Sequence, residues 1–134
     1  MAEESLRERR EAVVREHMES ENTQDFDVTL ATFAHPRYEL MATGQVYDGH
    51  DEVSRYYAAS RAVFPDQRNE LRALHHSDEA VIVEFDRLGT HKASGREFRS
   101  PMVALFFFEG DRIVNERVYY DQASIQRQLG LPAS

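Results

Sequence analysis

The sequence has 134 residues, with 24 acidic and 16 basic side chains, and its formal charge of −8 makes nucleic acid and anionic membranes poor partners. It contains no cysteine, which excludes disulfides, thiolate metal sites and a cysteine nucleophile. The length suits one domain over residues 1–134, and no apolar stretch approaches the ~20 residues that span a bilayer. We therefore expect a cytoplasmic protein that binds neither nucleic acid nor membrane.

The first half of the chain carries helical patterns around two short extended pieces. Apolar residues recur on one face after Ser5, Asp51 and Glu52 suit the first turn of a later helix, and Pro65 stops that helix. The expected elements are helices at residues 5–22, 26–34 and 49–64 and short strands at residues 38–42 and 45–47.

The second half changes to the two-residue period of strands. Four antiparallel strands are expected at residues 70–76, 80–91, 98–109 and 112–121, followed by a short helix at residues 122–129. The segment MVALFFF (102–108) is apolar at odd and even positions alike, so both of its faces should be covered, one by helices and the other by something such as a partner subunit. Helices followed by a curved sheet of long strands indicate an α+β domain.

Several chemistries lack their residues. The sequence has no GxGxxG, GxxxxGK[ST] or GxSxG motif, so the usual dinucleotide, nucleoside-triphosphate and hydrolase-elbow sites are not expected. The six histidines show no metal-ligand spacing, and His17 is interpreted as a boundary residue of the first helix. We expect no metal and no cofactor.

The last expected strand places polar groups on one side. Asn115, Arg117, Tyr119 and Asp121 alternate and so share a face, which is either solvated or lines a polar pocket. The second and fourth long strands run in the same direction, so their ends, with His91 and Asp121, should lie at one rim of the sheet. From that rim both side chains could reach into one cavity.

Four segments resemble a known family: HPRYELMATGQVYDGHDEV, FPD at residues 64–66, VIVEFDRLGTH, and DRIVNERVYYDQASIQRQLGL. They are similar to the SnoaL-like polyketide cyclases of the nuclear transport factor two-like superfamily. This resemblance implies a cone-shaped, cystatin-like α+β barrel, in which a curved antiparallel sheet wraps around the N-terminal helices. It also implies a homodimer.

The resemblance further implies an aldol cyclisation or isomerisation of a small apolar carbonyl compound, without metal or cofactor. In the cyclases an aspartate after the last long strand is the general base, and Asp121 matches that position. His91, in the GTH motif, matches a pocket residue that hydrogen-bonds the substrate or its developing oxyanion. Further candidate pocket residues are Arg117, Tyr119, Asn115, Tyr56, Tyr38 and Glu84.

Other interpretations stay open. Asp121 directly precedes a short helix, where its carboxylate could cap the helix and accept the amide of Ser124. Arg117 beside carboxylates could instead activate water, as in an epoxide hydrolase- or dehydratase-like enzyme. The same scaffold could also be a non-catalytic module that binds a small ligand or forms a dimer.

Overall fold

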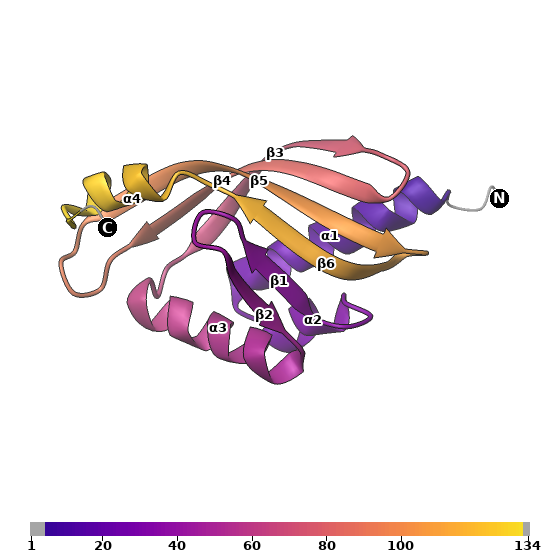
Figure 1. Cartoon of the computed structure of the whole chain (residues 1–134), viewed down its shortest axis with the longest axis horizontal. Helices are drawn as coiled ribbons and strands as arrows, with labels where there is room; N and C mark the ends of the chain where they lie inside the picture. The colour runs from indigo at the N-terminus through magenta and orange to yellow at the C-terminus, as the bar shows by residue number, and fades with distance from the viewer. Residues whose placement is uncertain (1–4, 133–134) are drawn as a thin grey trace.

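Three helices precede the long strands. The computed structural model describes residues 5–132. Helix α1 (Leu6–Thr23) begins where the Ser5 hydroxyl accepts the amide of Glu8 at 3.1 Å, and it ends at Gln24, which has the left-handed φ of 60°. Helix α2 (Phe26–Ala31) follows, and α3 (His50–Val63) comes after the first two strands. The three helices lie together along one side of the sheet (Figure 1).

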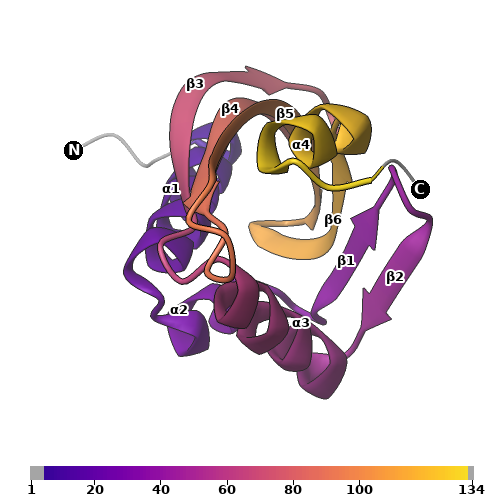
Figure 2. The same cartoon turned by 90° about the vertical axis from the view of Figure 1, so that its left-hand side faces the viewer.

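A single six-stranded sheet curls around these helices. Its order is β2-β1-β6-β5-β4-β3, and all neighbouring strands are antiparallel except β1 and β6. Figure 2 looks along the sheet, with strands and helices arranged in a ring. The strands are β1 (Arg37–Leu40), β2 (Gln45–Asp48), β3 (Arg68–His76), β4 (Ala80–Thr90), β5 (Glu97–Glu109) and β6 (Arg112–Tyr119).

Strand β5 shows which face of the sheet holds the core. Met102, Ala104 and Phe106 are buried on the inner face, and Ala104 and Phe106 have no exposed surface. On the outer face Leu105 and Phe107 are only half-buried. The helices therefore cover one face of this doubly apolar strand, and the other face is open within the single chain.

The last helix lies across one end of the ring. Helix α4 (Gln122–Leu129) begins at Asp121, whose carboxylate accepts the Ser124 amide at 3.0 Å, and ends at Gly130, whose φ of 69° suits glycine. The Gln128 side chain bonds the backbone of Arg99 in β5 through both its oxygen and its nitrogen. These contacts hold α4 at the rim of the sheet (Figure 2).

The α+β fold expected from the sequence is confirmed, as a curved sheet with helices on its concave side. The four long antiparallel strands and their order are as predicted. The sheet differs from the expectation in one pair, because β1 joins β6 in parallel. Among the residues that the structure describes, no helix is both long and apolar enough to cross a membrane.

Candidate functional site

A mostly apolar pocket of about 380 Å³ lies between α3, α4 and the inner face of the sheet. We call it the pocket. Its apolar wall includes Leu40, Val63, Phe64, Phe98, Met102 and Ile125. Its polar lining includes Tyr56, Ser60, Gln67, Arg87, His91 and Tyr120. An apolar cavity with a few convergent polar groups is the usual form of a small-molecule site.

A second hollow, of about 510 Å³, lies beside α3 and β2. It shares Tyr56 and Ser60 with the pocket, and its other lining residues include the charged side chains Glu52 and Arg55. It has no comparable apolar wall, so we regard the pocket as the candidate site.

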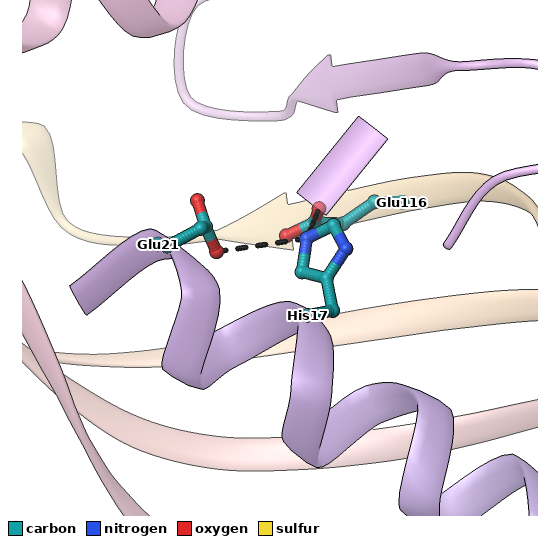
Figure 3. A group of neighbouring side chains, drawn as sticks. All are labelled: His17, Glu21 and Glu116. Atoms are coloured by element: carbon teal, nitrogen blue, oxygen red, sulfur yellow. Dashed lines mark ion pairs between the residues drawn. The ribbon is translucent and has the colours of Figure 1, made fainter. Parts of the chain in front are cut away.

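Five ionisable side chains lie in the interior of the cone: His17, Glu21, Arg61, Arg87 and Glu116, which we call the buried cluster. His17 Nε2 lies 3.0 Å from Glu116 Oε1 and 3.5 Å from Glu21 Oε1. Arg61 Nη2 lies 4.0 Å from the other Glu21 oxygen. Figure 3 shows the two contacts of His17, which join α1 to itself and to β6.

Hydrogen bonding determines which ring nitrogen of His17 carries a proton. The Thr32 hydroxyl donates to the backbone oxygen of Thr29 at 2.6 Å, so it accepts from His17 Nδ1 at 2.8 Å. With Nδ1 protonated, Nε2 faces two carboxylates and favours a second proton. Burial lowers the pKa of His17, but Glu116 and Glu21 outweigh burial and leave that pKa raised. Burial raises the pKa of Glu116 despite the opposing effect of His17, so both members of the pair hold a proton more tightly in the folded chain.

The nitrogen of His17 and the carboxylate oxygens of Glu21 and Glu116 lie within 4.8 Å of one another, a spacing that could hold a metal ion. However, the nitrogen that would have to bind a metal without a proton belongs to an imidazole whose pKa is raised, and Arg61 already approaches Glu21. We therefore interpret the group as an ion cluster. The sequence pattern predicts a boundary position for His17, whereas the structure buries it beside its partner Glu116, which lies far away in the chain.

Arg87, on β4, links the buried cluster to the pocket. It is 7% exposed and lines the pocket, and its Nε donates to Asn69 Oδ1 at 3.1 Å. It also lies close enough to interact with Tyr38, which is paired with Glu116 in the sheet register. Burial lowers the pKa of Arg87, but Tyr38, Tyr56 and Glu21 together raise it above its usual range, so the guanidinium stays charged.

Three of the candidate residues lie at or behind the pocket. His91 lines it, with Nδ1 2.8 Å from Ser94 Oγ and its ring 5.8 Å from that of Phe64. Tyr56 also lines it, and the Tyr56 ring lies 4.9 Å from that of Tyr38. Tyr38 is 2% exposed and is not part of the lining, but it packs against Tyr56, which is.

The other candidates lie outside the pocket lining. Arg117 contacts Glu39 at 3.2 Å and lies over the Phe107 ring at 4.9 Å, on the outer face of the sheet. Asn115 donates to Glu39 there. Tyr119 is 45% exposed, and Glu84 pairs with His75 at 2.7 Å.

Asp121 is exposed and caps α4. The alternation predicted along β6 is present, and it is the opposite face, with Glu116, Val118 and Tyr120, that points inward. The catalytic role of Asp121 stays a prediction, and its placement favours the capping alternative. The sequence alone does not show which face of β6 points inward, because this follows from the burial of its residues in the folded chain.

The SnoaL-like domain family model matches residues 14–116. The chain belongs to the SnoaL-like family. A search of curated proteins finds no match. The family assignment agrees with the resemblance that the sequence motifs carry.

Solved structures share the fold of this SnoaL-like chain. A putative SnoaL-like polyketide cyclase from Jannaschia sp. CCS1 is 17% identical, with a TM-score of 0.85 over 99% of each chain. A protein with a ketosteroid isomerase-like fold from Catenulispora acidiphila, in complex with trimethylamine, is 22% identical, with a TM-score of 0.83 over 90% of this chain and 93% of that one. IdmH, a putative polyketide cyclase from Streptomyces antibioticus, is 20% identical, with a TM-score of 0.79 over 91% and 99%.

Proposed function

We propose that this SnoaL-like protein carries out cofactor-independent acid/base chemistry on a small apolar carbonyl compound, as an aldol cyclisation or an isomerisation. The observation that carries the proposal is the pocket itself: an apolar wall with one imidazole, His91, and one buried guanidinium, Arg87. These two groups supply what proton transfer next to a carbonyl requires, namely an imidazole that can accept or donate a proton and a hydrogen-bond donor for the developing oxyanion.

His91 and Arg87 would have separate roles in the reaction. When a proton leaves the carbon next to a carbonyl, negative charge develops on the carbonyl oxygen, and a guanidinium in an apolar cavity stabilises that charge strongly. Ser94 occupies Nδ1 of His91, so Nε2 is the nitrogen open to a substrate. We therefore assign proton transfer to His91 and oxyanion binding to Arg87, in place of a base supplied by Asp121.

A ligand-binding module is the second candidate function. Within the described part of the chain, no carboxylate lines the pocket, and a strong carboxylate base is therefore missing from its surface. The water-activating alternative is less favoured, because Arg117 pairs with Glu39 on the outer face. A binding module would retain ligands in the pocket without changing them.

A substrate screen with a matched pair of variants separates catalysis from binding. Small ketones and ketoesters are screened first for thermal stabilisation and then for turnover by mass spectrometry. His91→Gln should abolish turnover and keep ligand stabilisation, while the control His75→Gln, which changes an exposed imidazole paired with Glu84, should match the wild type. Turnover that survives His91→Gln would refute the assignment, and stabilisation without turnover would favour a binding module.

We also propose that the protein is a homodimer joined through the outer face of β5. Leu105 and Phe107 are half-buried there in the single chain, and Arg117 covers the Phe107 ring at 4.9 Å. An apolar strip in the middle of a sheet gains stability when a second sheet covers it.

A further inference from the structure

The buried cluster contains more side chains that can carry a positive charge than carboxylates. The former are His17, Arg61 and Arg87, and the latter are Glu21 and Glu116. Its two carboxylates are contacted by His17, at 3.0 and 3.5 Å, and by Arg61, at 4.0 Å. Within the described part of the chain, no carboxylate oxygen lies within ion-pair distance of Arg87. Arg87 is therefore the member without an anionic contact, and it is also the member that lines the pocket.

The groups around Arg87 are hydrogen-bond donors that lack acceptors. Gln67 also lines the pocket and is 5% exposed, yet its side-chain nitrogen has no hydrogen-bond partner. The Asn69 oxygen accepts from Arg87, and the Asn69 nitrogen also has no hydrogen-bond partner, although Asn69 itself does not line the pocket. A buried donor without an acceptor is unfavourable, so the part of the pocket lined by Gln67 favours a ligand that brings an acceptor.

A carboxylate meets these demands. A guanidinium has five N–H donors, and Arg87 directs its Nε to Asn69, so donors are left over for a ligand even if one also serves Tyr38. A carboxylate supplies negative charge and two acceptor oxygens in a geometry that matches a guanidinium. The rest of such a ligand should be apolar, because Phe64, Phe98 and Met102 line the same pocket.

We propose that the pocket binds a small apolar monocarboxylate, with its carboxylate on Arg87 and within reach of Gln67. This inference rests on the proposed function only in using the same pocket, and it narrows the substrate to a carbonyl compound that also bears a carboxylate. A compound of one or two rings, or a branched chain of similar size, suits the volume of about 380 Å³.

Calorimetric titration with benzoate, phenylacetate and cyclohexanecarboxylate tests the proposal. Each acid is compared at pH 7 with its primary amide and its methyl ester, which keep the apolar body and remove the charge. We expect at least one acid to bind tenfold or more tightly than its amide and ester. Equal affinity across each set, or no binding by any acid, would overturn the proposal.

Two variants locate the binding, and a third is the control. Arg87→Met should abolish the preference for acid over ester, and Gln67→Leu should weaken acid binding severalfold without touching the charge. Arg72→Gln changes an arginine that pairs with Asp86 on the outer face, and it should bind like the wild type. If Arg87→Met does not fold, Gln67→Leu decides alone, and acid binding unchanged in Gln67→Leu would then refute the site.

These experiments distinguish a failure of the carboxylate site from a failure of the proposed catalytic function. Acid binding that depends on Arg87, with no turnover of any keto acid, would establish the carboxylate site and refute catalysis. Turnover of neutral ketones that His91→Gln abolishes, with no preference for acids, would support the catalytic proposal and refute the carboxylate site.

Discussion

His17 Nε2 lies 3.0 Å from Glu116 Oε1, and this contact ties α1 to β6 through the interior of the cone. The two side chains are 0% and 1% exposed, so water does not screen the pair. The rings of Phe33 and Phe106 meet the imidazole edge-on at 5.3 and 5.0 Å and hold it against the carboxylate. The apolar pocket thus lies next to an interior that is charged.

Glu116→Gln should lower the free energy of unfolding by about 3 kcal/mol, because removing one partner of a buried ion pair leaves the other uncompensated. Gln keeps the shape of Glu, so a cavity would not explain the loss. Urea unfolding at neutral pH measures the effect. Glu84→Gln is the control: Glu84 pairs with His75, both about half exposed, and should cost less than about 1 kcal/mol. Equal effects of the two substitutions would show that the buried pair contributes no special stability.

The buried pair should also make stability fall as pH rises. A histidine whose folded pKa is raised contributes stability that is fully present below its unfolded pKa, near the ordinary 6.5, and that is lost as pH rises through the folded pKa. The raised pKa of Glu116 acts in the same direction, because the folded state holds the proton more tightly than the unfolded chain. Glu21 and Arg61 also face this site.

Unfolding at about pH 6 and about pH 9 checks this linkage. The wild type should lose more stability between the two values than His17→Gln, which has no imidazole to titrate. His50→Gln is the matched control, because His50 is an exposed histidine. A wild-type pH dependence no steeper than that of His17→Gln would contradict the raised pKa of His17.

The sequence predicted the elements well because their signals are local. Asp51 and Glu52 mark the first turn of a helix, Pro65 marks its end, and a two-residue period after Pro65 marks the strands. Each of these signals acts over a few residues, and all the corresponding elements are present. What it did not predict is which face of β6 points inward. Both faces of β6 carry polar and apolar side chains, so the pattern does not distinguish them. The charged Glu116 is buried, and the aromatic Tyr119 is exposed.

The buried cluster could not be predicted for a related reason. All five members are of types that are usually found at the surface. His17 and Glu21 lie one turn apart on α1, but only the folding of the sheet and α3 around that helix brings the other three close to them. The one available signal was that Glu116 and Arg87 interrupt strands that are otherwise apolar on their inner faces. A charged residue at an inward position indicates a partner across the core, without identifying it.

Replacing Asp121 should distinguish its cap from its predicted catalytic role. The carboxylate accepts the Ser124 amide at 3.0 Å, so Asp121→Ala should lower the free energy of unfolding by about 1 kcal/mol, while Asp121→Asn, which can still cap, should be nearly neutral. Thermal unfolding measures both. With a substrate in hand, Asp121→Asn should keep turnover. Loss of turnover without loss of stability would restore the carboxylate as the base.

The outer face of β5 is the proposed dimer interface, and a substitution on that face tests it. If two sheets pack through Leu105 and Phe107, then Leu105→Glu places a charge in the middle of the interface and should convert the dimer to a monomer. Val46→Glu is the control, because Val46 on β2 is 43% exposed and lies at the sheet edge, away from β5.

Sedimentation at micromolar concentration should show a dimer for the wild type and for Val46→Glu, and a monomer for Leu105→Glu. Circular dichroism must show that Leu105→Glu is folded, which is expected because Leu105 is only half-buried in the single chain. A wild-type monomer would refute the dimer, and a dimer that survives Leu105→Glu would place the interface on another surface.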